Sequence, residues 1–354
     1  MKHVIQGKSL YFSKMAGKKS AKDLFAYLAL YDENSEDHAN FVPLSMGAPG
    51  KATLSGCNKL MTEATNSLLR DSNEERFTFQ YGPCKGDPSF CEQVAGFLTE
   101  EYGTKVDSSD IMVSAGATQG LHLVATVMFN KDTPIFIEDP TYFIAVKILR
   151  EDFGMNIIPV PTDMEGIDVA KLESLLEIYK PKTTGKAGSQ FWSMVYTIPT
   201  YNNPKGYCMS PERCRALVKL ARKYGVMLFA EDVYNMLHYD DKPQCPPRLL
   251  QYDDSATAWS GGSFNHYTSK LMAVALQEGL LQKHLTWLRK EYRERMDLAC
   301  NTLEKHLPAG VKVDNPHGGF FIWLQLPPSI DSMELLKLAV QKYKVNFIFG
   351  ARLI

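Results

Sequence analysis

The chain of 354 residues carries 39 basic and 40 acidic side chains, and 45% of its residues are hydrophobic. At roughly 150 residues per domain, this length predicts two or three lobes around a large buried core. The balanced charge excludes the basic surplus that is typical of nucleic-acid-binding proteins. Because no apolar run approaches the roughly 20 residues that a membrane span needs, we expect neither a nucleic-acid nor a membrane partner.

The cysteines indicate a reducing compartment. There are seven of them, an odd number, and none forms a CxxC pair. This usage is typical of reduced, mostly buried cysteines in an intracellular protein. The basic opening segment lacks the apolar core of a secretory signal. We therefore expect a cytoplasmic protein, and we predict no metal site.

From about residue 110 onward, short apolar runs alternate with helical stretches. The runs are continuous, as in strands that are buried on both faces, and they lie at residues 111–113, 134–137, 156–160, 191–198 and 226–230. Helical patterns at residues 118–130 and 211–224 lie between them. Strand, helix and strand at this spacing predict an α/β fold with a mostly parallel central sheet.

The second half of the chain has a different organisation. No strand-length apolar run lies between residues 235 and 259, where prolines and aspartates accumulate. Further elements are predicted as helices at residues 267–285, 286–306 and 332–343 and as strands at 318–326 and 346–354. The predicted domains are an N-terminal segment (1–44), a large domain (45–284) and a smaller, truncated α+β C-terminal domain (285–354).

Two motifs at strand ends bring an anion site and an aromatic ring. SAGATQGLH at residues 114–122 opens a helix near Thr118, so free N–H groups meet a helix N-terminus that attracts anions. An ordinary strand–helix turn explains this motif equally well. EDPTYF at residues 138–143 directs Tyr142 across a pocket, where its ring could stack on another ring. A packed loop aromatic is the commoner role.

Two later motifs bring an amide and carboxylates. In PTYNNPKG at residues 199–206, the proline that follows Asn203 favours an extended backbone, which fixes the amide at the strand end. A plain turn is the alternative. In FAEDVY at residues 229–234, a carboxylate at a buried strand end needs a partner, and a protonated pyridine nitrogen is one. Helix capping by Glu231 or Asp232 competes with this interpretation.

The order of these motifs indicates one shared site. Ligand sites in open parallel sheets form at the carboxyl ends of the strands. An anion cradle, a stacking ring, an amide and a carboxylate together suit a phosphorylated and hydroxylated pyridine.

With YGPCKGD at residues 81–87 and HGGFFIWLQLP at 317–327, these motifs resemble class I/II aminotransferases of fold type I, which depend on pyridoxal 5′-phosphate (PLP). The likeness is greatest to the aminoadipate/kynurenine-type subgroup and covers roughly residues 40–350. It implies amino-acid and 2-oxo-acid substrates and a homodimer.

The resemblance also assigns residues. It implies that the phosphate binds at Ala117 and Thr118 and that Tyr142 stacks on the pyridine ring. Asn203 and Tyr234 would hold the O3′ atom of the cofactor.

Two further assignments concern the pyridine nitrogen and the substrate. The family carboxylate that pairs with the nitrogen lies three residues before that tyrosine, which is Glu231 here. Since the family usually has aspartate at this position, Asp232 is the alternative. Gly47 would lie near the substrate carboxylate.

One family segment has no counterpart. The resemblance places the Schiff-base lysine, in Ser-x-Ser-Lys between two strands, after Glu231 and before the helix predicted from residue 267. We interpret its absence as one contiguous deletion near residues 256–259 that removes both strands. Lys270, preceded by a serine, is the competing candidate, and an exposed helix position is the interpretation that we favour for it.

A second loss is expected at the C-terminus, because Arg352 comes too early to be the family arginine that pairs with the substrate carboxylate. We therefore expect weakened, non-covalent PLP binding and no turnover. A splice isoform, a gene-model error or a pseudoenzyme that pairs with a full-length protomer would each explain such a chain. A transcription regulator is disfavoured, since residues 1–44 contain no basic recognition helix.

Overall fold

The computed structural model describes residues 42–45, 47–70, 78–181, 191–239, 246–252 and 266–350. These residues form two compact units. The larger unit runs from residue 48 to 327, and the smaller unit combines the described residues up to Gly47 with residues 328–350.

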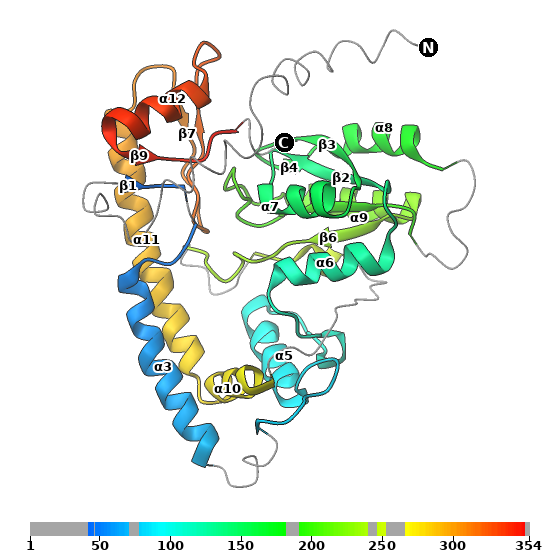
Figure 1. Cartoon of the computed structure of the whole chain (residues 1–354), viewed down its shortest axis with the longest axis vertical. Helices are drawn as coiled ribbons and strands as arrows, with labels where there is room; N and C mark the ends of the chain where they lie inside the picture. Colours follow the sequence, from blue (N-terminus) through cyan, green and yellow to red (C-terminus); the bar gives the residue numbers. More distant parts are fainter. Residues whose placement is uncertain are drawn as a thin grey trace. The chain divides into compact units, whose positions relative to one another are not determined.

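The larger unit contains a five-stranded sheet in the order β4-β3-β2-β5-β6 (Figure 1). Strand β2 pairs in parallel with β3 and β5, and β5 pairs in parallel with β6, whereas the short β4 is antiparallel to β3. The strands are β2 (Pro134–Asp139), β3 (Asn156–Asp163), β4 (Gly166–Ile167), β5 (Met194–Thr197) and β6 (Met227–Ala230). The mostly parallel α/β fold is thereby confirmed.

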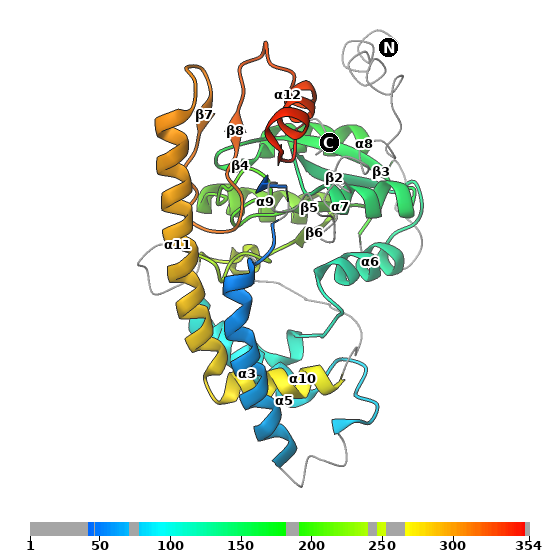
Figure 2. The ribbon, with the colours of Figure 1, turned by 60° about the vertical axis from the view of Figure 1, so that its left-hand side comes forward.

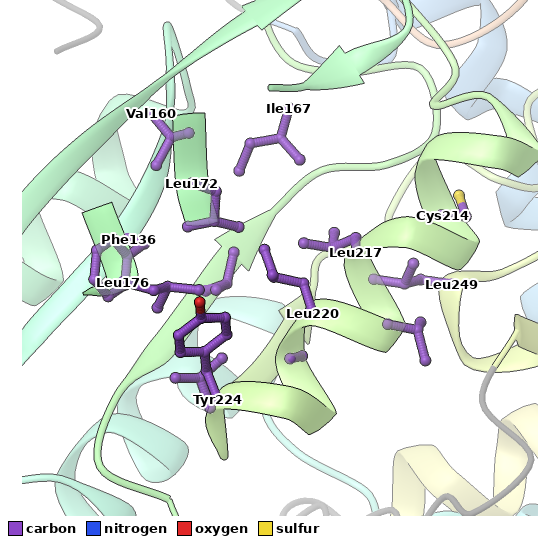
Figure 3. Close-up of a cluster of buried hydrophobic side chains, with 14 of the residues drawn as sticks. Phe136, Val160, Ile167, Leu172, Leu176, Cys214, Leu217, Leu220, Tyr224 and Leu249 are labelled. Atoms are coloured by element: carbon purple, nitrogen blue, oxygen red, sulfur yellow. The ribbon is translucent and has the colours of Figure 1, made fainter. Parts of the chain in front are cut away.

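Helices cover both faces of this sheet because its side chains are apolar on both sides. On one face, Phe136 and Val195 pack with apolar residues of α8 and α9. Figure 3 shows this cluster in close-up, with Phe136, Leu176 and Leu217 among the labelled residues. On the other face, Ile135 and Tyr196 pack with residues of α6 and α7. The helices are α6 (Ala117–Met128), α7 (Phe143–Val146), which continues as η3 (Lys147–Asp152), α8 (Val169–Tyr179) and α9 (Pro211–Tyr224).

Local sequence signals set the ends of these helices. Helix α9 begins after Ser210, whose hydroxyl accepts the Arg213 N–H, has proline at its first position, and ends at Gly225 in the left-handed conformation. Asp168 caps α8 in the same way by accepting the Lys171 N–H. These caps satisfy N–H groups that a helix N-terminus otherwise leaves unpaired.

A helical layer in the same unit packs around α3 (Lys51–Arg70), which runs alongside α11 (Leu280–His306) in both ribbon views (Figure 2). Leu60, Ala64 and Leu68 repeat every four residues on one face of α3 and pack against Leu271 and Ala275 of α10 (His266–Gln277). Other elements of this unit are α5 (Pro88–Tyr102), η2 (Ser108–Asp110), η4 (Leu249–Tyr252), β7 (Lys312–Val313) and β8 (Leu324–Gln325).

Four predicted elements differ in the structure. Among the described residues, the strand predicted at 346–354 is present only as β9 (Val345–Asn346). Residues 111–113 are not a strand, because the Val113 N–H donates to Lys85 O at 2.9 Å instead of to a neighbouring strand. The strand predicted at 318–326 is reduced to β8, preceded by an isolated bridge between Gly318 and His238. Helices α10 and α11 separate at Gly279, whose φ of 67° is left-handed, and not near residue 285.

In the smaller unit, β1 (Val42–Pro43) pairs in parallel with β9 (Val345–Asn346). Helix α12 (Ser332–Leu338) begins after Asp331, which accepts two backbone N–H groups, and continues as η5 (Ala339–Tyr343). Leu336, Val340 and Phe349 form its apolar cluster.

The predicted domain boundary between residues 284 and 285 falls inside α11 and stays a prediction. The predicted deletion point at 256–259 and Arg352 lie outside the described residues. None of the helices in the described part of the chain has the length and apolar character needed to cross a membrane.

Candidate cofactor site at the carboxyl end of the sheet

The N-terminus of α6 forms one wall of the candidate site. Gly116 precedes the helix with φ 84° and ψ 167°, a conformation that suits glycine, and no side chain caps the first turn. A Cβ atom at Gly116 would meet no atom within 4 Å, so the approach to these N–H groups is open. The first residues of α6, Ala117 and Thr118, therefore present free amides and the positive end of the helix dipole.

Two tyrosines contribute rings to the site. Tyr142 lies between the end of β2 at Asp139 and the first residue of α7. Burial raises the pKa of its phenol, and the nearby Glu231 raises it further. Tyr234 follows β6, and burial raises its pKa to about 12 although a hydrogen bond with Asn203 opposes the shift. The edges of Phe320 and Phe321 contact the Tyr234 ring at centroid distances of 5.7 and 5.9 Å.

Asn203 lies on a loop that one buried carboxyl group holds in place. Glu138 at the end of β2 is 1% exposed and accepts hydrogen bonds from the Ile198 N–H (3.0 Å), Asn202 Nδ2 (2.9 Å) and Tyr207 OH (3.0 Å). The Thr197 hydroxyl donates a fourth. Burial raises the pKa of Glu138 to about 7 against the effect of these donors. Glu138 thus ties the loop after β5 to the neighbouring strand.

The structure separates the two candidate carboxylates after β6. Glu231 lines the cavity, and its Oε2 accepts a hydrogen bond from the Tyr196 hydroxyl. Burial raises the pKa of this carboxyl group. Asp232 is half-buried beside Arg248 and Asn235 and is not part of the cavity lining, and desolvation of its carboxyl group raises its pKa to about 6. Of the two, Glu231 is the one placed to meet a ligand.

These groups surround one cavity of about 200 Å³. Its lining is Ala117, Thr118, Tyr142, Ile198, Asn203, Glu231, Val233 and Tyr234. The structure therefore brings together every cofactor-binding residue assigned from the sequence except Asp232. Ile198 and Val233 were missed, as were the supporting residues Glu138 and Tyr196. The one available signal for Tyr196 was its position in a predicted strand, where successive side chains point to opposite faces of the sheet.

Lys270 occupies a different place. Its side chain, on α10, is 11% exposed, and its Nζ lies 3.7 Å from Oδ2 of Asp87, which is also buried. Asp87 caps α5 by accepting the Phe90 N–H at 2.9 Å. The expected exposed position of Lys270 was wrong, and Lys270 is not among the residues that line the cavity. Gly47 belongs to the smaller unit, so its role near a substrate carboxylate stays a prediction.

Comparisons with known proteins agree with this fold. The family profile of class I and II aminotransferases matches residues 40–262. An aromatic-amino-acid aminotransferase 1 of Thermococcus litoralis is 27% identical over 366 aligned positions, covering 94% of this chain and 84% of the relative. A 2-aminoadipate transaminase of Thermus thermophilus is 24% identical and covers 81% of this chain and 76% of the relative.

A solved structure extends the likeness to three dimensions. The crystal structure of Pyrococcus horikoshii kynurenine aminotransferase, a complex with PMP, KYN and KYA, superposes with a TM-score of 0.80 at 26% identity. The match covers 98% of this chain and 90% of that one. The chain belongs to the class I and II aminotransferase family.

Proposed function

We propose that the cavity binds PLP without a covalent bond to lysine, and that this chain does not transaminate as it stands. The residues fit the ring and phosphate of PLP, since an uncapped helix N-terminus, a stacking ring, an amide–phenol pair and a half-buried carboxylate line one cavity. When bound, PLP supplies an electron sink that weakens bonds at the α-carbon of an amino acid.

Each contact has a physical reason. The amides of Ala117 and Thr118 bind the phosphate at the positive end of α6. The Tyr142 ring lies against the pyridine face. Asn203 and Tyr234 donate to O3′, and the carboxylate of Glu231 pairs with the protonated ring nitrogen, which relieves the unfavourable burial of that charge.

The observation that carries the proposal is the lining of the cavity. Among the described residues it contains no lysine, arginine or histidine. A lysine would bind the cofactor covalently and then move the substrate proton, and losing a general base alone slows a reaction by about 10²–10⁴-fold. The carboxylate and phenols of this cavity serve to position a ring.

Two observations support a missing internal segment. The alignment with the Thermococcus litoralis relative runs over 366 positions, more than the 354 residues of this chain, so that relative has residues with no counterpart here. In addition, β6 ends the sheet, with no strand beyond it in the described residues, and Met227–Ala230 are only half-buried. A strand that is apolar on both faces is typical of a sheet interior and not of an edge.

The open edge of β6 also favours the second candidate, a non-catalytic chain that associates with a full-length protomer or with its own copy. Its family substrates would be an aromatic or 2-aminoadipate-like amino acid and a 2-oxo acid, in keeping with the names of the relatives. We propose a cytoplasmic location and a dimer on the same family grounds.

Equilibrium titration of the full chain with PLP tests the proposal. We expect saturable binding that dialysis reverses, together with no amino-group transfer from aromatic or 2-aminoadipate donors. Binding that is absent, or that Asn203→Ala and Tyr142→Ala leave unchanged, would contradict the assigned cavity. Amino transfer by the purified chain would contradict the proposed inactivity.

A further inference from the structure

The carboxyl group of Glu231 reaches the cavity on a flexible side chain. Glutamate carries its carboxyl on rotatable bonds that a ligand contact has to immobilise, which opposes binding through lost rotamer freedom. A second, permanent contact removes most of that cost, because it fixes one oxygen before the ligand arrives.

Tyr196 provides such a contact. It lies on β5 directly opposite Phe229 of β6, and the two rings stack with centroids 5.9 Å apart at 17°. Its side chain is 0% exposed and belongs to the apolar cluster under α6 and α7. The hydroxyl is the one polar atom of this side chain, and it donates to Oε2 of Glu231.

We propose that Tyr196 is a positioning residue that holds Oε2 of Glu231, so that Oε1 faces the cavity and pairs with a protonated ring nitrogen. This inference rests on the proposed function, since it concerns how the same cavity selects a pyridine over a carbocyclic ring. Tyr196 does not line the cavity and acts only through Glu231.

The hydroxyl also influences the charge of Glu231. Burial raises the pKa of this carboxyl, and the hydrogen bond from Tyr196 lowers it. Loss of the hydroxyl therefore both frees the carboxyl group and favours its protonated, neutral form. A neutral acid cannot form the charge-assisted hydrogen bond that distinguishes a protonated ring nitrogen from a C–H group.

The test measures selectivity instead of activity. The probes are PLP and its carbocyclic analogue, in which a C–H group replaces the ring nitrogen. Their dissociation constants are measured by titration for the wild type, Tyr196→Phe, Glu231→Asp and the double variant. The ratio of the two constants isolates the contact at the nitrogen, because phosphate, O3′ and ring stacking are common to both probes.

Tyr224→Phe is the matched control. Tyr224 is also a buried tyrosine whose hydroxyl donates to a glutamate, Glu177, but it lies on α9 outside the cavity lining. We expect the control to keep the wild-type ratio, whereas Tyr196→Phe lowers the preference for PLP about tenfold. In the Glu231→Asp background, Tyr196→Phe changes the preference by less than about twofold, because the shorter side chain cannot keep both contacts.

The outcomes separate the inference from the proposed function. If the wild type binds neither probe, both fall. If it prefers PLP and Tyr196→Phe keeps that preference, or weakens both probes equally, only the inference falls. Should Tyr196→Phe fail to fold, site-specific 3-fluorotyrosine at this position keeps the shape and strengthens the donor. The preference for PLP should then rise above that of the wild type, and an unchanged preference would overturn the inference.

Discussion

Lys270 and Asp87 form a buried ion pair, with Nζ and Oδ2 3.7 Å apart, that joins α10 to the N-terminal cap of α5. Both side chains are at most 11% exposed. A buried charged group is costly unless it is paired, and the opposite charge of the other residue offsets that cost for both Lys270 and Asp87. The ion pair therefore gives Lys270 a structural role, which is an alternative to the role of Schiff-base lysine.

Replacing Lys270 with methionine should destabilise the protein without affecting the cavity. Removal of the cation leaves the buried Asp87 carboxylate with the Phe90 N–H bond and His266 Nδ1 at 3.8 Å as its remaining polar neighbours, and we expect a loss of about 1–3 kcal/mol in the free energy of unfolding. Urea denaturation measures it. Lys290→Met, at a side chain that is 75% exposed, is the control and should change little. If Lys270→Met loses PLP binding while its stability is unchanged, Lys270 binds the cofactor and the structural role is wrong.

Ring stacking by Tyr142 should be separable from its hydroxyl group. Tyr142→Phe keeps the flat ring, so we expect PLP affinity close to that of the wild type. Tyr142→Ala removes the ring and should weaken PLP binding about three- to tenfold, the range of an aromatic pair. Fluorescence titration with PLP gives both values. Equal affinity in Tyr142→Ala and the wild type would remove Tyr142 from the site.

The ionisation of Glu138 should appear in the pH dependence of stability. Its pKa in the folded protein, about 7, lies above the ordinary value of 4.5, so between these values the folded state binds more protons than the unfolded state. The stabilising contribution is therefore fully present below pH 4.5 and is lost as the pH rises through 7.

Glu138→Gln provides the reference, since its amide does not ionise. The free-energy advantage of the wild type over this variant should shrink by about 3 kcal/mol between acid pH and pH 8. Urea denaturation at several pH values measures the difference. An advantage that grows with pH would mean that the hydrogen-bond donors around Glu138 outweigh its burial.

Close packing at Gly318 predicts a large effect of one methyl group. A Cβ atom there would lie 2.4 Å from Cζ of Tyr201 and 2.6 Å from the carbonyl oxygen of Leu237, and the backbone oxygen cannot easily move. We expect Gly318→Ala to destabilise the protein by about 1–3 kcal/mol. Gly96 on α5 meets no atom within 4 Å, so Gly96→Ala should stabilise by up to about 1 kcal/mol. Thermal denaturation of both variants checks the contrast.

Much of the larger unit could be predicted because its strands are continuous apolar runs between capped helices. The run at residues 134–137 is within β2, and the helical pattern at 211–224 is α9. The strand predicted at residues 111–113 was wrong, because an apolar run indicates burial but does not identify a neighbouring strand. The Val113 N–H donates to the Lys85 carbonyl oxygen instead. The long strand expected at 318–326 does not form at Gly318 and Gly319, which pack closely against Tyr201.

The cavity could be predicted in part for a related reason. Motifs at strand ends converge because parallel strands finish at one edge, so Thr118, Asn203 and Glu231 were accessible from the sequence. The choice between Glu231 and Asp232 could not be made from the sequence, because it depends on which side chain turns into the cavity. The burial of Lys270 also depends on Asp87, which is remote in the sequence.

Borohydride reduction of the full chain with saturating PLP, followed by peptide mass spectrometry, determines whether any lysine of this chain binds the cofactor covalently. Reduction makes a lysine-bound cofactor permanent. The non-covalent site proposed here predicts that PLP binds in equilibrium titration while no lysine becomes stoichiometrically modified. A stoichiometric phosphopyridoxyl group on Lys270, or on any other single lysine, would contradict it.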